Sequence, residues 1–195
     1  MNFASFKEVT EVVNKQRFAD SPLGKMSEGK LFDKPMSEYD KPLGIIYENL
    51  RNCPIEDNNG HWDGERGNSK WHPDRNSIPG KSNPENKTWG EILDKYGIDG
   101  ISFKDGEPDF SEISKGNVEI KPFSTDRSDN FDKADIELAK QKGCTPEEVA
   151  KWRKENGYTW HECKDMKTMQ KVPSEVHNNI PHSGGISEAK KGNGE

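Results

Sequence analysis

The stretch that decides the fold is residues 158–185, YTWHECKDMKTMQKVPSEVHNNIPHSGG. It opens with the β-prone aromatic triplet Tyr158–Trp160 and passes through a polar segment, Lys164–Lys167, that is able to turn. The chain then returns through Met169–Val172 as a second short strand, and Pro181 ends any helix that follows because proline interrupts helical hydrogen bonding. The pattern therefore predicts a strand, a loop, a second strand and a short helix.

Three of the five histidines of the chain lie in this stretch, namely His161, His177 and His182. The first strand carries His161 and Glu162 at its end, and the short helix, which we expect Ser174 to cap, carries His177. Because His177 and His182 are five residues apart, they do not share one helical face, so they converge only if the helix stops between them. This arrangement predicts a cluster of imidazoles beside a carboxylate.

Such a cluster suits the hydrolysis of a phosphodiester, which requires an activated water and a positive centre near the phosphate. A neutral imidazole accepts the proton of a water near pH 7, and a divalent metal stabilises charge on the phosphate and the leaving oxygen. Imidazole ligands favour Zn or Ni, whereas carboxylate and water ligands favour Mg or Mn. From the residues alone, surface histidines without a joint role and a purely structural metal site stay open as alternatives.

Several short motifs follow one another in order along this stretch: Trp160-His161-Glu162, Met169-Gln170, Val172-Pro173, His177 and His182-Ser183-Gly184-Gly185. This run resembles the WHH group of the HNH/endonuclease VII superfamily of nucleases. The resemblance implies a ββα-metal finger that cleaves DNA with a single bound metal ion. Members of the group are commonly toxin domains of bacterial polymorphic toxins, so the resemblance also implies a cognate immunity protein.

The resemblance implies a role for each matching position. His161 is expected to be the general base, with Glu162 near the metal, and His177 and His182 are expected to bind one divalent ion (Mg, Mn, Zn or Ni). Gln170 is expected to brace the loop. Many members carry a further histidine directly after the Trp-His pair, where this chain has Glu162, so the division of roles between base and ligand stays open.

Three lysines flank the predicted hairpin, namely Lys164, Lys167 and Lys171. We expect them to contact nucleic-acid phosphates, with an ordinary solvated surface as the alternative. The expected substrate is DNA. A nuclease of the same fold that acts on RNA and a non-catalytic interaction module with a structural metal are the alternatives.

The composition predicts a loop-rich fold with a thin core, because only 29% of the 195 residues are hydrophobic, 33% are charged and the mean hydropathy is −1.12. A net charge of −6 and an isoelectric point near 5.5 are unusual for a protein that binds nucleic acid. Basic residues slightly outnumber acidic ones from Lys140 onward, which permits a locally basic face.

Upstream signals predict an α+β fold in which helices and a small antiparallel sheet precede the ββα-metal finger. Thr88 and Glu91 form a capping-box pattern that begins a helix, and Gly97 ends it. Apolar residues alternate over 101–103 and 118–120, which predicts the small sheet.

Two more helices are expected at 130–142 and 146–156. The second has Thr145 as its N-cap, Pro146 in its first turn, and Val149 and Trp152 as its buried edge.

The segment from residue 51 to residue 86 is rich in Asn, Gly, Pro and Ser. We expect an ordered loop there, anchored by Trp62 and Trp71. A short helix is expected near Phe6–Val13, where apolar residues recur at helical spacing.

These signals divide the chain into three parts. Residues 1–86 are expected to be a loop-rich delivery or helper region, 87–187 the nuclease domain with its ββα-metal core at 157–185, and 188–195 a mobile tail. The sequence contains neither a signal-peptide pattern nor an apolar run long enough to span a membrane. We expect the protein to act in the cytoplasm of a target bacterium, after export as part of a larger toxin.

Overall fold

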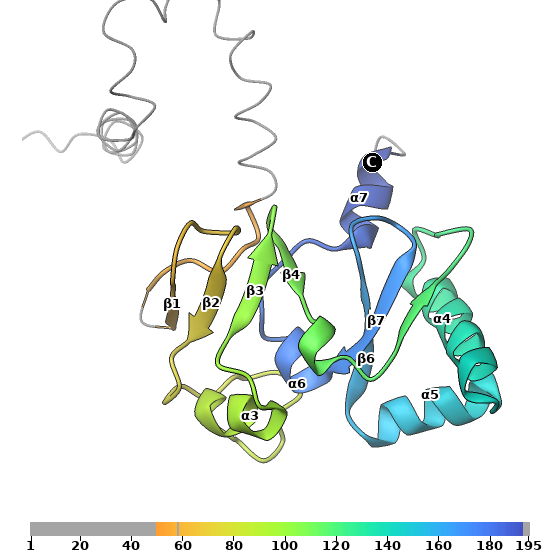
Figure 1. Ribbon diagram of the computed structural model, residues 1–195, viewed down its shortest axis with the longest axis horizontal. Coiled ribbons are helices and arrows are strands. Elements are labelled where there is room, and N and C mark those ends of the chain that lie inside the picture. Colours follow the sequence, from red (N-terminus) through yellow and green to blue (C-terminus); the bar gives the residue numbers. More distant parts are fainter. Residues whose placement is uncertain (1–49, 58, 193–195) are drawn as a thin grey trace, which may run out of the picture. The chain divides into compact units, whose positions relative to one another are not determined.

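Two antiparallel sheets organise the α+β fold of this chain, whose computed structural model describes residues 50–57 and 59–192 (Figure 1). The first sheet has four strands in the order β1 (Gly60–Trp62), β2 (Lys70–Pro73), β3 (Ile101–Lys104) and β4 (Glu107–Asp109). The second has three strands in the order β5 (Asn117–Glu119), β7 (Thr168–Pro173) and β6 (Tyr158–Glu162). The helix expected near Phe6–Val13 lies outside the described residues.

The segment expected to be an ordered loop contains the β1–β2 hairpin, so the prediction of a loop over 51–86 was wrong for these residues. Trp62 lies opposite Trp71 in the hairpin, and both rings are buried, which confirms that the two tryptophans anchor the segment. An aromatic pair facing across two strands stabilises the pairing even where polar residues surround it. The indole nitrogen of Trp62 also donates a hydrogen bond to the carbonyl of Pro54 at 3.1 Å.

Helix α3 (Trp89–Tyr96) begins and ends as predicted. Thr88 and Glu91 form both hydrogen bonds of a capping box, and Gly97 ends the helix with a φ of 69°. A left-handed backbone of this kind favours glycine because it has no Cβ. Ile92 and Leu93 are fully buried on the inner face of the helix.

The strands expected at 101–103 and 118–120 both form, but they do not share one sheet. Strand β3 pairs with β2 and β4, whereas β5 pairs with β7. The 3₁₀ turn η3 (Ser111–Ile113) lies between β4 and β5 in the sequence. Alternation of apolar residues indicates which face of a strand is buried, but it does not specify the strand's partner.

Helices α4 (Arg127–Lys142) and α5 (Pro146–Glu155) pack against the β5–β7–β6 sheet and against each other (Figure 1). Their core is formed by buried apolar residues from both layers: Val118, Ile120, Ala134, Leu138, Ala139, Val149, Trp160 and Met169. Thr145 caps α5 with a capping box, as its sequence predicts. Trp152 is 41% exposed, so the prediction that it is buried was wrong. Its ring instead lies against Tyr158 and the Lys171 ammonium.

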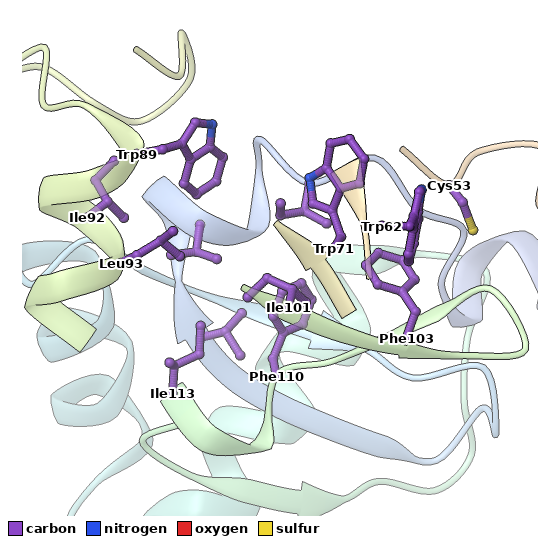
Figure 2. Packing of buried hydrophobic residues seen from close by; sticks show 13 residues of the cluster. Cys53, Trp62, Trp71, Trp89, Ile92, Leu93, Ile101, Phe103, Phe110 and Ile113 are labelled. Atoms are coloured by element: carbon purple, nitrogen blue, oxygen red, sulfur yellow. The ribbon is translucent and has the colours of Figure 1, made fainter. Parts of the chain in front are cut away.

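The stretch that was expected to decide the fold forms β6, β7 and the one-turn helix α6 (Ser174–His177), as predicted. Pro173, rather than Ser174, occupies the N-cap of α6, and no side chain caps it. Val172 and Val176 extend from this unit into a second apolar core that includes the tryptophans of the first sheet (Figure 2). The β6–β7 hairpin therefore contributes buried side chains to two apolar cores.

Helix α7 (Gly185–Gly192) covers most of the segment that was expected to be a tail. Residues 50–57 and 59–192 belong to one compact unit. Among the residues that the structure describes, no helix is long and apolar enough to cross a membrane.

Candidate metal centre

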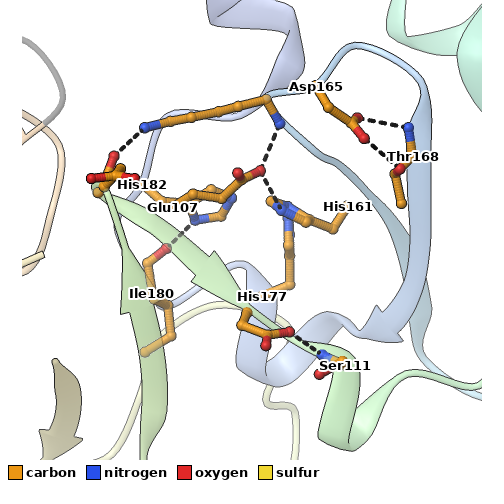
Figure 3. Close-up of polar contacts among 12 residues, drawn as sticks. Glu107, Ser111, His161, Asp165, Thr168, His177, Ile180 and His182 are labelled. Atoms are coloured by element: carbon orange, nitrogen blue, oxygen red, sulfur yellow. Dashed lines mark hydrogen bonds and ion pairs between the residues drawn. The ribbon is translucent and has the colours of Figure 1, made fainter. Parts of the chain in front are cut away.

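Three imidazoles converge at one end of the β6–β7 hairpin. His161 lies near the end of β6, His177 is the last residue of α6, and His182 follows Pro181. Each histidine contributes one ring nitrogen to the cluster, and these three nitrogens lie within 4.8 Å of one another. The Nδ1 atom of His161 is 3.3 Å from the Nε2 atom of His177, and Figure 3 shows these rings beside strand β4. The structure therefore brings together the three histidines that the sequence singled out.

Phe110 packs against the three imidazoles, and sequence analysis did not identify it. Its side chain is completely buried, and its ring contacts all three imidazoles, with centroid distances of 5.0, 5.6 and 5.8 Å. A rigid aromatic ring that touches every member of the cluster limits how far each imidazole can rotate. Phe110 thus helps to fix the geometry of the cluster before any ligand binds.

Two glycines let the loop that carries His182 lie against β6. A Cβ on Gly184 would lie 2.6 Å from the carbonyl oxygen of Glu162, and one on Gly185 would lie 2.5 Å from that of Cys163. These separations are shorter than real Cβ contacts, so a larger residue at either position would push the loop away. The Gly-Gly motif that the sequence analysis noted is therefore needed for the approach of His182.

Hydrogen bonds orient two of the three imidazoles. The Nδ1 atom of His177 lies 3.1 Å from Oδ1 of Asn178, and that of His182 lies 2.8 Å from the carbonyl oxygen of Ile180. Both partners are oxygen acceptors, so each Nδ1 carries the hydrogen and each Nε2 keeps a free lone pair.

The Nε2 atom of His161 is different, because it is buried and has no hydrogen-bond partner among the described residues. The nearest carboxylate oxygen that pairs with it, Oε1 of Glu107, is 3.9 Å away.

Burial favours the neutral form of all three imidazoles. It lowers the pKa of His161 and His182 below the usual range, with the neighbouring imidazoles adding to the effect on His161. It lowers the pKa of His177 to about 3. Neutral imidazoles have lone pairs that bind cations, and three of them within 4.8 Å match the nitrogen ligands of a divalent transition metal. The buried Nε2 atom of His161, which has no hydrogen-bond partner among the described residues, is consistent with a metal site.

Glu162 lies beside the cluster but does not join it. Its carboxylate accepts hydrogen bonds from Nε of Arg127 and from Nδ2 of Asn130, both at 2.9 Å. The side chain is almost fully buried, whereas that of Arg127 is 62% exposed. Burial raises the pKa of Glu162, and its two donors partly offset this rise. Helix α4 thus supplies a guanidinium and an amide that hold the carboxylate in place.

A pocket of about 290 Å³ opens above these groups. Its lining brings together the three histidines, the Glu162 carboxylate and the exposed cations of two separate segments: His161, His177, His182, Glu162, Arg127 and Lys81. The remaining lining comes from α7 and the loop that follows α6. The pocket therefore offers metal-ligating nitrogens, a carboxylate and positive charge to one bound molecule.

The remaining predicted residues lie away from this pocket. Lys164 donates from its ammonium to the carbonyl of Asp105, and Lys167 donates to Glu119. Lys171 is buried, with its ammonium 4.3 Å from the centroid of the Trp152 ring.

Gln170 is paired with His161 across the β6–β7 ladder. Its side chain makes no hydrogen bond within the described part of the chain, and its role in bracing the loop stays a prediction.

Residues 100–184 match the model of the DNase/tRNase domain of colicin-like bacteriocins. The matched segment is a little less than half of the chain, and it contains all three histidines, Glu162 and Arg127. It agrees with the nuclease resemblance found in the sequence. No curated protein matches the chain.

Arg127, Asn130, Phe110 and Glu107 are the residues of this site that sequence reasoning missed. Each comes from a segment 30 or more residues before the histidine motif, in β4, α4 or the turn that follows β4. The capping signals of α4 indicate a helix, but they do not show which of its residues face the pocket.

Proposed function

We propose that this chain is a metal-dependent endonuclease that hydrolyses DNA phosphodiester bonds. The observation that carries the proposal is the three-histidine cluster, whose neutral nitrogens lie within 4.8 Å of one another at the base of a pocket that also contains Arg127 and Glu162. The match of residues 100–184 to a nuclease domain of bacteriocins supports the same reaction.

All three histidines are proposed as metal ligands, including His161, which sequence analysis expected to be the base. Its Nδ1 atom faces His177 and its Nε2 atom faces Glu107, so both nitrogens are directed at other side chains. A divalent cation held by this cluster would polarise a phosphoryl oxygen and stabilise charge on the leaving oxygen.

Glu162 is proposed as the general base. It is the carboxylate that lines the pocket, and burial raises its pKa toward the range in which a carboxylate accepts a proton efficiently near neutral pH. Asn130 and Arg127 each occupy one oxygen of the carboxylate, and each oxygen keeps a second lone pair for a water. The two donors therefore orient the base without blocking it.

Arg127 is proposed to bind the scissile phosphate. Its Nε donates to Glu162, which fixes the guanidinium at the edge of the pocket, while most of the side chain is exposed. The remaining N–H groups of a guanidinium are suited to hold two oxygens of one phosphate. Lys81 lines the same pocket and adds positive charge.

The biological setting is proposed from the family match. A nuclease domain similar to those of bacteriocins would act as a toxin in the cytoplasm of a competing bacterium. The producing cell would need an immunity protein that neutralises the domain. Co-expression of this chain with and without a candidate immunity protein, read out as colony survival, tests that part of the proposal.

The central experiment incubates supercoiled plasmid with the full chain and Mg, Mn, Zn or Ni, with EDTA as the control. We expect nicking that depends on metal and that is lost in His177→Ala. The matched control is His61→Ala, which removes an exposed histidine of β1 and is expected to leave nicking unchanged. Intact plasmid with every metal would contradict the proposal.

The same assay separates the alternatives. The family description names both DNase and tRNase domains, so transfer RNA and total RNA are included as substrates. Cleavage of RNA but not plasmid would assign the site to RNA. Tight metal binding without cleavage of either substrate would favour a non-catalytic module with a structural metal.

A further inference from the structure

The three histidines differ in the hydrogen-bond acceptor available to the ring nitrogen that does not bind the metal. The Nδ1–H groups of His177 and His182 donate to Asn178 and to the carbonyl of Ile180. In metal centres built from histidine, the nitrogen that does not bind the metal usually donates to an oxygen acceptor, which fixes the tautomer and orients the ring. His177 and His182 already have such an acceptor.

We propose that Glu107 is the missing acceptor, a positioning residue that orients His161 toward the metal. This inference rests on the proposed metal-dependent function. The buried Nε2 atom of His161 has no hydrogen-bond partner among the described residues, and Oε1 of Glu107 lies 3.9 Å from it. A hydrogen bond requires these two atoms to approach each other to about 3.2 Å or less.

The tautomer of His161 gives Glu107 its role. Because the Nδ1–H of His177 donates to Asn178, the Nε2 atom of His177 is an acceptor, and Nδ1 of His161 at 3.3 Å is placed to donate to it. Binding a metal through Nδ1 of His161 requires this hydrogen to leave, so Nε2 must carry the hydrogen instead. A carboxylate facing Nε2 stabilises that tautomer.

The carboxylate of Glu107 is held in position for this task (Figure 3). Its Oε1 atom accepts a hydrogen bond of 2.6 Å from the backbone N–H of Lys164. The ammonium of Lys164 reaches the carbonyl of Asp105 at 2.9 Å, which ties the β6–β7 loop to the β3–β4 turn. Glu107 therefore connects the first sheet to the hairpin that carries His161.

A different arrangement uses the same residues. Glu107, His161 and Cys163 also place ligand atoms within 4.8 Å of one another, which would allow a separate metal site. The three-histidine group offers a complete set of nitrogen ligands without Glu107, and Oε1 of Glu107 already accepts the backbone N–H of Lys164 at 2.6 Å. We therefore assign Glu107 to the hydrogen bond rather than to coordination.

The first test measures the affinity of the full chain for Zn²⁺ and Ni²⁺ by calorimetry. Glu107→Ala is expected to weaken binding by about 10–100-fold, as loss of an outer-shell acceptor does. Glu107→Gln keeps an acceptor oxygen without the charge and is expected to fall between wild type and Glu107→Ala. Cys163→Ser is the matched control and is expected to bind as wild type does. Equal affinity in wild type and Glu107→Ala overturns the proposal.

The second test reads the tautomer directly and does not depend on activity. ¹⁵N-labelled histidine in the Zn²⁺-bound wild type is expected to show Nε2–H and metal-bound Nδ1 for His161 in long-range ¹H–¹⁵N spectra. A metal-bound Nε2 overturns the proposal. If Glu107→Ala unfolds, as judged by circular dichroism, the spectra of wild type and Glu107→Gln still decide the matter.

The outcomes separate this inference from the proposed function. A wild-type chain that binds none of the metals refutes the metal-dependent function itself, and with it the role of Glu107. Loss of affinity in Cys163→Ser equal to that in Glu107→Ala shows that Glu107 and Cys163 coordinate the ion, which contradicts the positioning role alone.

Discussion

The Nδ1 atom of His161 lies 3.3 Å from the Nε2 atom of His177, although the residues are 16 positions apart in the chain. The two belong to different elements, strand β6 and helix α6. The turn from β7 directly into α6 brings them together, and Phe110 lies against both rings. This contact supports the proposal that His161 binds the metal and that Glu162 is the base.

Glu162→Gln is expected to lower the single-turnover rate of cleavage by about 10²–10⁴-fold, the usual contribution of a general base. The affinity for metal is expected to stay within about threefold, because Glu162 contacts Arg127 and Asn130 rather than the three ligands. Glu137→Gln, at a partly exposed position of α4, is the control. His161→Ala is expected to lose metal affinity. If it keeps full affinity and loses only cleavage, His161 is the base.

Arg127→Gln is expected to weaken DNA binding and to reduce the slope of log affinity against log salt by about 0.9, the value for one lost phosphate contact. The measurement is fluorescence anisotropy of a labelled duplex at several salt concentrations, with Ca²⁺ in place of an active metal. Lys140→Gln is the control, because its ammonium pairs with Glu137 within α4. An unchanged slope in Arg127→Gln would remove this residue from the phosphate site. Lys164, Lys167 and Lys171 stay predictions for contacts outside the pocket.

The metal-free chain is expected to lose stability as pH falls below about 6.5, the usual pKa of an unfolded histidine. Burial lowers the folded-state pKa of His177 to about 3, so between these values the unfolded chain binds a proton that the folded chain does not. Acid therefore favours unfolding in this window. The buried carboxylates Glu107 and Glu162 have raised pKa values and act in the opposite direction, so a variant must isolate the histidine.

His177→Asn provides that comparison. Urea unfolding at pH 7.5 and pH 4.5 is expected to show a smaller loss of stability for His177→Asn than for wild type. His61→Asn, at an exposed position of β1, is expected to behave as wild type does. The same loss of stability in all three proteins would show that His177 is not responsible.

Asp135→Ala is expected to destabilise the α4–α5 layer by about 3–5 kcal/mol, because it leaves the buried Arg153 without its partner. Asp135 binds the guanidinium at 2.8 Å and also accepts a hydrogen bond from the indole of Trp160 at 2.8 Å. Urea unfolding at pH 7.5 measures the change. Lys140→Gln, which breaks an exposed ion pair with Glu137, is expected to cost less than about 1 kcal/mol. Similar losses of stability in Asp135→Ala and Lys140→Gln would contradict this prediction.

The sequence by itself determined the local elements and the three histidines that the site brings together. Capping boxes at Thr88 and Thr145 began their helices as predicted, and the run from Tyr158 to Gly185 formed strand, loop, strand and short helix. These signals act over three or four residues, through hydrogen bonds and side-chain spacing that a single segment contains. The convergence of His161, His177 and His182 followed from the same local pattern.

The tertiary structure alone decided which strands pair and which distant residues complete the site. Strand β5 joined β7 rather than β3, and Trp152 stayed exposed because the face of α5 that packs on α4 carries Arg153 and Val149. Arg127 reaches Glu162 from α4, and Glu107 faces His161 from β4. Such contacts depend on how layers pack across many residues of chain, and no local periodicity contains that information.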